Sequence, residues 1–214
     1  MKTEFILAAA HTVNHAILAN EAAIESLDRD IGDGDHYLNI KRGCATVVAM
    51  EQELAGLSPD AVLQKIGMKL LSAIGGASGP LLASFFMEMA KAVKLNNPQT
   101  LEETALVFAA GVEAVKHRGK ADIGEKTMLD VLIPVARTFT TLAQDKAPPA
   151  EIYKALKQTA EEGVLATRDM IATKGRAAFL GERAKGHIDA GAKSSQVMIA
   201  AVCDLALERL STSA

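Results

Sequence analysis

Four aspartates lie within one short, glycine-containing stretch from Asp28 to Asp35, and His36 follows at once. Carboxylates crowded in this way repel one another and raise each other's pKa unless a cation offsets their charge. Mg²⁺ prefers carboxylate oxygens and leaves coordination positions for water or phosphate oxygens. Asp33 and Asp35 are two residues apart, so in an extended loop their side chains point the same way. The pattern predicts a divalent metal site, with His36 as a ligand, a phosphate donor or a helix cap.

A calcium-binding loop and a solvated turn are two other interpretations of this acidic stretch. A calcium-binding EF-hand loop counted from Asp28 would need Gly at position six and Glu at position twelve. The chain has Asp33 and Asn39 there, so that pattern fails. A solvated turn with a helix cap stays open, because Asp and Gly are common turn residues.

A second unusual stretch, Gly75-Gly76-Ala77-Ser78-Gly79-Pro80, precedes an apolar helical pattern. Glycines let the backbone approach a ligand closely, and a helix N-terminus attracts anions through its free N–H groups. No Gly-Lys-Ser/Thr follows and no strand precedes it, so it is neither a Walker A loop nor a Rossmann turn. A plain connection between helices is the alternative. Combined with an acidic metal loop, the stretch favours binding of a diphosphate.

The rest of the chain predicts helices that position these loops. Apolar residues recur at spacings of three and four almost throughout, and no segment alternates as a strand would. Thr100 with Glu103 forms a capping-box pattern, and Ser58-Pro59 is typical of a helix start. We predict an all-α single domain over 1–214, a bundle or barrel of about eight helices, with the helices near 6–27, 38–54, 58–74, 80–93, 100–119, 127–142, 148–173 and 194–210.

Glycines concentrate in the connections after the first, third, fifth and seventh predicted helices. If the helices run up and down, alternate connections fall at one end of the bundle. We therefore expect the acidic stretch and the glycine-rich stretch to meet at one rim.

Composition excludes some classes of protein. The net charge is -3, without the basic face typical of a nucleic-acid binder. No apolar run approaches the roughly 20 residues that span a membrane, and the N-terminus lacks a signal-peptide pattern. Cys44 and Cys203 each lie in an apolar stretch, which favours buried free thiols and a reducing compartment. These features predict a cytoplasmic protein.

Taken together, the motifs resemble the L subunit of phosphotransferase-dependent dihydroxyacetone kinases, a domain that also forms the C-terminal half of single-chain ATP-dependent dihydroxyacetone kinases. The resemblance covers nearly the whole chain. It rests on 27–36, on 75–80, on Arg118-Gly119-Lys120, on Lys126-Thr127-Met128 with Asp130, and on 175–183. It implies an eight-helix antiparallel barrel with a nucleotide at its rim.

The resemblance also implies a set of site residues. Asp28, Asp33 and Asp35 would hold two Mg²⁺ ions that bridge the phosphates of ADP or ATP. The residues expected around the nucleotide are His36, Tyr37, Leu38, Asn39, Ala77, Ser78, Gly119, Thr127, Met128, Arg176, Asp189 and Gly191. No covalent nucleophile is expected.

The function implied is that of a subunit that keeps ADP as a resident coenzyme. A phosphocarrier of the sugar phosphotransferase system would phosphorylate it in place, and the ATP formed would phosphorylate dihydroxyacetone on a separate K subunit, for which this chain has no room. Two alternatives remain: an ATP-exchanging subunit for another triose or tetrose, and a non-enzymatic nucleotide sensor that binds a transcription regulator. A homodimer is also compatible with the sequence.

Two departures from the family pattern affect these expectations. Tyr37 stands where the family has Gly, so we expect its ring to crowd a phosphate or to stack over the ribose. Ala190 replaces the Pro of an Asp-Pro-Gly segment, which predicts a looser lid and easier exchange of ADP.

Overall fold

The computed structural model describes residues 1–212, and within them it contains helices and no strand, which confirms the all-α prediction. The α-helices are α1 (Thr3–Ala19), α2 (Glu21–Ile31), α3 (His36–Ala49), α4 (Glu51–Leu54), α5 (Pro59–Ala73), α6 (Ser78–Asn96), α7 (Leu101–Gly119), α8 (Leu129–Gln144), α9 (Pro149–Ala166) and α10 (Ala190–Thr212). Two 3₁₀ segments, η1 (Thr167–Asp169) and η2 (Arg176–Ala184), lie between α9 and α10.

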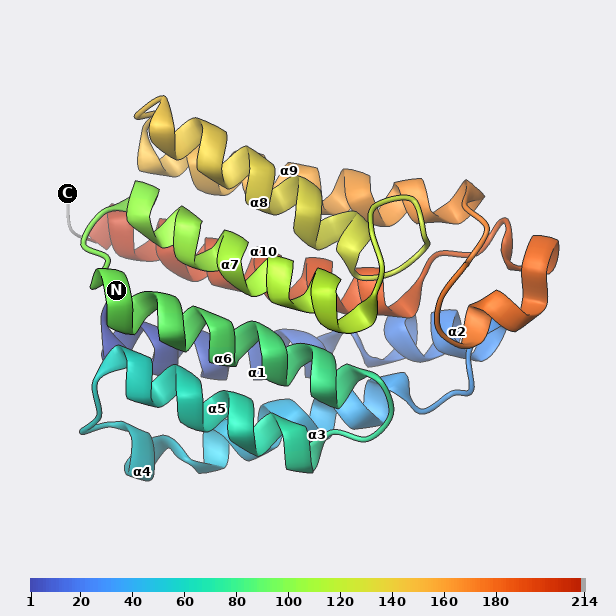
Figure 1. Cartoon of the computed structure of the whole chain (residues 1–214), viewed down its shortest axis with the longest axis horizontal. Coiled ribbons are helices and arrows are strands. Elements are labelled where there is room, and N and C mark those ends of the chain that lie inside the picture. The colour runs from blue at the N-terminus through green and yellow to red at the C-terminus, as the bar shows by residue number, and fades with distance from the viewer. Residues whose placement is uncertain (213–214) are drawn as a thin grey trace.

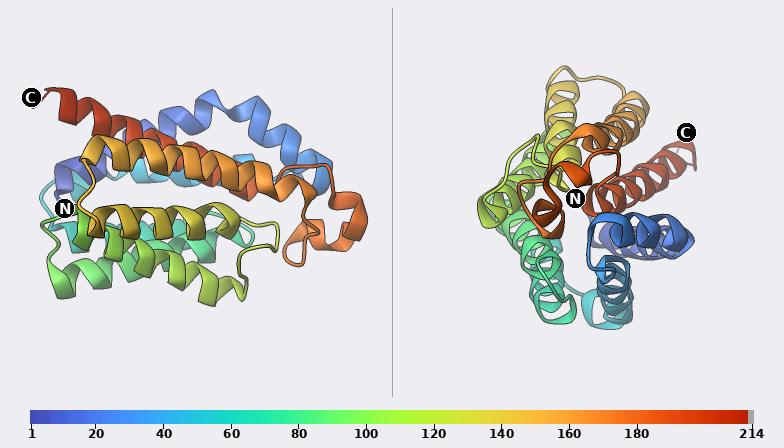
Figure 2. Two further views of the ribbon diagram at one scale, coloured as in Figure 1. Left: turned by 90° about the horizontal axis from the view of Figure 1, so that it is seen from above. Right: turned by 90° about the vertical axis from the view of Figure 1, so that its right-hand side faces the viewer.

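Eight of these helices form a closed antiparallel ring. In order around it, α1, α3, α5, α6, α7, α8, α9 and α10 each pack on the next, and α10 returns to α1. The end-on view in Figure 2 shows this ring. Helix α2 continues from α1 and packs on α3 and α10. The prediction of an eight-helix antiparallel barrel is therefore confirmed.

Local sequence signals account for several helix ends. The Thr100 hydroxyl accepts from the backbone N–H of Glu103, whose carboxylate accepts from the N–H of Thr100, so the capping box is formed. Pro59 is the first residue of α5, where its missing N–H costs nothing. Helix α7 keeps helical geometry through Gly119, and Lys120 adopts the left-handed conformation after it, with φ of 48°.

Other helix bounds differ from the prediction. The first predicted helix is two helices, because the backbone of Asn20 leaves helical geometry and its side-chain amide donates to the Ala16 carbonyl. The second breaks at Met50 into α3 and α4. The seventh ends at Ala166, where η1 begins, rather than near Thr173.

The ring encloses an apolar cavity of about 720 Å³. Its lining comes from all eight ring helices and includes Phe5, Ile66, Phe85, Phe108, Leu156 and Val202. Both cysteines are free thiols, as predicted; Cys203 is buried, whereas Cys44 is half-buried rather than buried. None of the helices in residues 1–212 is both long and apolar enough to cross a membrane.

Because the ring helices alternate in direction, their connections fall into two groups. Figure 1 shows the connections 32–35, 74–77, 120–128 and 167–189 at the same end, on the right of the view. We call this end the glycine rim. The connections 55–58, 97–100 and 145–148 lie at the opposite end.

Candidate functional site

Three of the four crowded aspartates converge at the glycine rim. Asp28 lies in the last turn of α2 and is buried, whereas Asp33 and Asp35 lie exposed in the connection to α3. One carboxylate oxygen from each lies within 4.8 Å of the others. The fourth, Asp30, turns away to His187, with its carboxylate 3.4 Å from Nδ1. The structure thus gathers the three residues that were predicted to hold metal.

The backbone around Asp28 fixes its carboxylate. The N–H of His36 donates to Asp28 Oδ2 at 2.9 Å. A Cβ on Gly32 would lie 1.9 Å from Asp28 Oδ1, so this position admits only glycine while the carboxylate stays in place. Gly34 has φ of +76°, a conformation that glycine adopts without strain. The glycines of the acidic stretch therefore allow the chain to fold closely around its carboxylates.

His36 connects this cluster to α10. Its Nε2 lies 2.9 Å from the hydroxyl oxygen of Ser194, and that hydroxyl donates to the Gly191 carbonyl. A hydroxyl has one hydrogen, so Ser194 accepts from His36 Nε2–H, and Nδ1 is left as an acceptor. Burial lowers the pKa of His36, although Asp28, Asp35 and Asp33 act in the opposite direction. The ring is therefore neutral near pH 7.

The glycine-rich stretch lies beside the acidic one. A Cβ on Gly75 would lie 3.1 Å from Asn39 Oδ1, so the glycine-rich connection lies against the first turn of α3, which directly follows the acidic stretch. A Cβ on Gly79 would lie 2.3 Å from the Ile74 carbonyl oxygen. Ala77 is exposed, and Ser78 begins α6. The N-terminus of this 19-residue helix thus opens onto the rim.

The connection 120–128 is held over the start of α8 by a buried carboxylate. Asp130 accepts from the N–H groups of Gly124 at 2.5 Å and Thr127 at 2.7 Å. Met128 is half-buried, and its Cβ lies 3.8 Å from where a Cβ on Gly191 would be. The predicted nucleotide residues Thr127, Met128 and Gly191 therefore lie on adjoining elements.

Lys126 is almost fully buried, at 1% exposure. Its ammonium donates to the carbonyls of Thr167 and His187, at 2.5 Å each, and to that of Arg168 at 3.4 Å. Burial lowers its pKa, although Asp189, Asp169 and Asp130 act in the opposite direction. Lys126 thereby joins the two ends of the connection 167–189. Sequence reasoning missed this role.

The connection 167–189 covers one side of the cluster. Arg176 Nε lies 2.8 Å from Asp33 Oδ2, and both side chains are largely exposed. At the other end of the connection, Asp189 accepts from the N–H of Ala192 at 2.7 Å. Burial raises the pKa of Asp189 to about 6. Arg176 is thus beside the carboxylate cluster, as a phosphate contact would require.

Three further predicted nucleotide residues differ in their surroundings. Tyr37 packs in the core with Ile17, Ile24, Ile40 and Val197 and is 1% exposed. That position does not favour the expected contact with a phosphate or a ribose. Leu38 is exposed, and Gly119 ends α7 beside Leu81 of α6.

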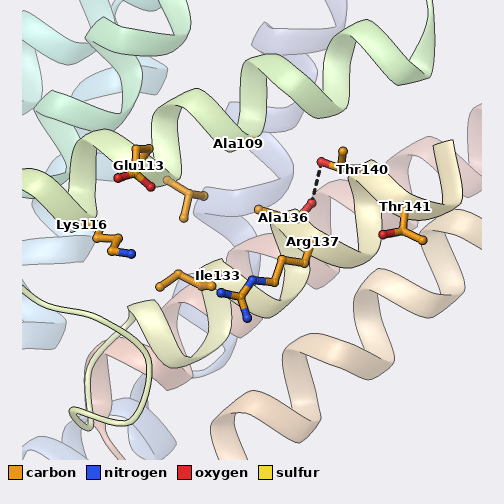
Figure 3. A pocket seen from close by; sticks show the side chains of 9 residues that line it. Ala109, Glu113, Lys116, Ile133, Ala136, Arg137, Thr140 and Thr141 are labelled. Atoms are coloured by element: carbon orange, nitrogen blue, oxygen red, sulfur yellow. Dashed lines mark hydrogen bonds between the residues drawn. The ribbon is translucent and has the colours of Figure 1, made fainter. Parts of the chain in front are cut away.

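A shallow groove of about 350 Å³ lies outside the ring between α7 and α8 (Figure 3). Figure 3 shows Lys116 and Arg137 along it. Lys116 forms an ion pair with Asp122 in the connection 120–128, at 2.8 Å. None of the residues predicted for metal or nucleotide lines this groove.

Comparison with known proteins then places the chain in a family. The DAK2 domain model matches residues 30–204. The chain belongs to the DAK2 domain family. This DAK2 domain is 41% identical, over 176 residues, to the protein named "PEP-dependent dihydroxyacetone kinase, ADP-binding subunit DhaL" of Escherichia coli K12, covering 82% of this chain and 84% of that one. It is 40% identical over 183 residues to the "PTS-dependent dihydroxyacetone kinase, ADP-binding subunit DhaL" of Lactococcus lactis, covering 85% and 86%.

A solved structure shares the fold. The dihydroxyacetone kinase from C. freundii, in complex with AMP-PNP and Mg²⁺, matches this DAK2 domain with a TM-score of 0.72 at 23% identity. The match covers 93% of this chain and 33% of that one, so the DAK2 domain spans about a third of the solved kinase. The barrel architecture is thereby shared with a larger enzyme.

Proposed function

We propose that this DAK2 domain is the nucleotide-carrying subunit of a dihydroxyacetone kinase and holds ADP at the glycine rim. The kinship with ADP-binding subunits over more than four fifths of the chain supports this function. One structural observation carries it: three carboxylates lie within 4.8 Å of one another, beside a glycine-rich connection and a helix N-terminus.

The chemistry of the cluster fits Mg²⁺. Asp28, Asp33 and Asp35 offer hard oxygen donors and no sulfur or nitrogen, the donor set that Mg²⁺ prefers. The backbone N–H of His36 orients the Asp28 carboxylate before any ion arrives. When bound, two such ions would neutralise the phosphates and polarise the transferred phosphoryl group.

The residues around the cluster have separable tasks in this proposal. The N-terminus of α6, with Ala77 and Ser78, offers N–H groups to phosphate oxygens. Arg176 brings a positive charge next to Asp33. Met128 and Gly191, which adjoin each other, form the side toward the rest of the nucleotide. The domain positions and neutralises a nucleotide, and it needs no covalent nucleophile of its own.

We further propose that the domain works with two partners. A phosphocarrier of the phosphotransferase system would supply the phosphoryl group to the bound ADP, and a dihydroxyacetone-binding K subunit would present the acceptor. The free thiols of Cys44 and Cys203 are compatible with the reducing cytoplasm, where both partners would be met.

The proposal is tested by the nucleotide content of the purified chain. Protein prepared without added nucleotide and then denatured should release ADP in a 1:1 ratio to chains, which chromatography would quantify. Asp33→Asn should lower the retained ADP at least tenfold, because it removes one of three carboxylates that balance the metal charge. Helix content measured by circular dichroism should not change, because Asp33 is exposed.

Asp145→Asn is the matched control, since Asp145 is an exposed aspartate at the opposite end of the barrel. It should retain ADP like the unmodified chain. Retention by Asp33→Asn at the control level would rule out the metal assignment. Rapid exchange of bound ADP with free ATP, together with turnover without a phosphocarrier, would support the ATP-using alternative instead.

A further inference from the structure

Phe179 is the most exposed large apolar side chain in residues 1–212, at 84% exposure. It lies in η2, within the connection 167–189, at the glycine rim. Figures 1 and 2 show this segment extending beyond the end of the ring. A phenyl ring held in water loses the stabilisation that burial would give it. Phe and Arg are among the residue types that are enriched in protein interfaces relative to the rest of the surface.

The exposure of Phe179 is built into a folded segment. Its neighbours Ala177 and Leu180 pack in a small cluster with Ala184 and Ile31. Beyond them, the N–H of Gly186 donates to the Arg168 carbonyl at 2.8 Å. Because the segment around it is anchored, the ring of Phe179 is presented outward by the fold.

Positively charged residues are close to Phe179 in the sequence. Between residues 174 and 187 the chain carries Lys174, Arg176, Arg183 and Lys185 but only one carboxylate, Glu182, although the chain as a whole has a net charge of -3. Among the described residues, no ion pair or hydrogen bond involves the side chain of Arg183, and that side chain is exposed. The ion pairs of the other three cations are solvent-exposed and weak, so carboxylates of a partner can replace them.

We propose that Phe179 and Arg183 form the docking contact for the subunit that holds the phosphoryl acceptor, an inference that rests on the proposed function. The matching surface is an apolar pocket ringed by carboxylates. The acceptor subunit is favoured over the phosphocarrier because a small hydroxyl-bearing ketose competes with water for the phosphoryl group. The interface that delivers it must exclude water, and an aromatic anchor does so.

The test uses Phe179→Ala and Leu95→Ala in the full chain loaded with Mg-ADP. Leu95 is a matched control, because it is 73% exposed and lies in the last turn of α6 at the opposite end of the barrel. The rate of dihydroxyacetone phosphate formation is measured while the concentration of the dihydroxyacetone-binding subunit is varied and the phosphocarrier is in excess. Phe179→Ala should raise the apparent KM for that subunit at least tenfold, with kcat and ADP retention unchanged.

Arg183→Glu should raise the same KM and weaken its dependence on salt, and Leu95→Ala should leave it unchanged. If the unmodified chain retains no ADP or gives no turnover, the proposed function is overturned. If the unmodified chain also fails to bind the dihydroxyacetone-binding subunit, the docking inference is overturned as well. An active unmodified chain with Phe179→Ala at the same KM overturns the docking inference alone. An effect of Phe179→Ala seen only when the phosphocarrier concentration is varied would also overturn the docking inference. Loss of ADP retention in Phe179→Ala would overturn it too, because Phe179 would then be part of the nucleotide site.

Discussion

Two charged residues at the glycine rim, Lys126 and Asp189, are largely shielded from water and have few hydrogen-bond partners. The Lys126 ammonium donates to three backbone carbonyls, including that of Thr167. The backbone N–H of Asp189 donates to the hydroxyl of the same Thr167. Burial raises the pKa of Asp189 to about 6, while the Ala192 N–H and the Lys126 charge act to lower it. The rim therefore contains a carboxyl group whose charge state changes in mildly acidic solution.

The raised pKa of Asp189 predicts a pH-dependent stability. Its ordinary value is 3.8, so between about pH 4 and pH 6 the folded chain binds more protons at this site than the unfolded chain. Stability from this group is present below that window and is lost as the pH rises through it. Compared with Asp189→Asn, the nucleotide-free chain should lose about 2–3 kcal/mol of unfolding free energy across the window. Urea unfolding at pH 5 and pH 7 measures somewhat less than half of this change, about 1.3 kcal/mol.

Asp122→Asn supplies the control for this measurement. The Lys116 ammonium lowers the pKa of Asp122, so its contribution is lost only when the pH falls below about 4. The difference between this variant and the unmodified chain should stay flat from pH 5 to pH 7. A flat difference for Asp189→Asn as well would contradict the charge state assigned to it.

At the scale of helices, one close contact joins the barrel to the rim. A Cβ on Gly163 of α9 would lie 2.5 Å from the backbone oxygen of Asp130 and 3.0 Å from the Cα of Val131, both in α8. The backbones of α8 and α9 thus approach each other at the residue that holds the connection 120–128. The spacing of α8 and α9 and the shape of the rim are coupled there.

Gly163→Ala should therefore destabilise the chain, although alanine normally favours a helix by about 1 kcal/mol. The added methyl meets backbone atoms that cannot rotate away, and overpacking of this kind costs roughly 1–3 kcal/mol. Gly56→Ala is the matched control, because no atom lies within 4 Å of its added methyl. It should be neutral or slightly stabilising in urea unfolding. Equal stability of the two variants would show that α8 and α9 separate freely.

Helices and their order were largely predictable, because apolar spacing and caps are local signals. The Thr100–Glu103 capping box and the start of α5 at Pro59 are examples. The break at Asn20 was not predictable, because apolar residues continue at helical spacing on both sides of it. Tyr37 was assigned by its place in the family motif, whereas its position three residues before Ile40 on α3 directs it into the core.

The rim was predictable in outline only. Alternation of helix direction placed the glycine-bearing connections together, the crowding of four aspartates predicted a metal site, and the family resemblance singled out the three that converge. The contacts of Lys126 with the Thr167 and His187 carbonyls, and of Ser194 with His36, were not predictable, because the partners lie 41 to 158 residues apart in the chain. Local sequence carries no signal for such contacts.

Across the whole molecule, the predicted site residues lie toward the glycine rim, and none lies at the opposite end of the barrel. Connections at both ends are exposed and should exchange amide hydrogens by local opening, whereas the middle of each ring helix exchanges only when the chain unfolds globally. A ligand stabilises only those states that bind it. Mg-ADP should therefore slow exchange in the connections 32–35, 74–77, 120–128 and 167–189, and in the slowest amides of the helices.

The connections 55–58, 97–100 and 145–148 should exchange at the same rate with and without Mg-ADP, because their local opening leaves the glycine rim intact. Hydrogen exchange followed by mass spectrometry resolves these segments in one experiment, with apo chain and ADP without Mg²⁺ as references. Protection at both ends would mean that the nucleotide binds within the barrel or that the ends are coupled. Protection at the glycine rim alone would show that the nucleotide binds at the end where the alternating helix directions bring these four connections together.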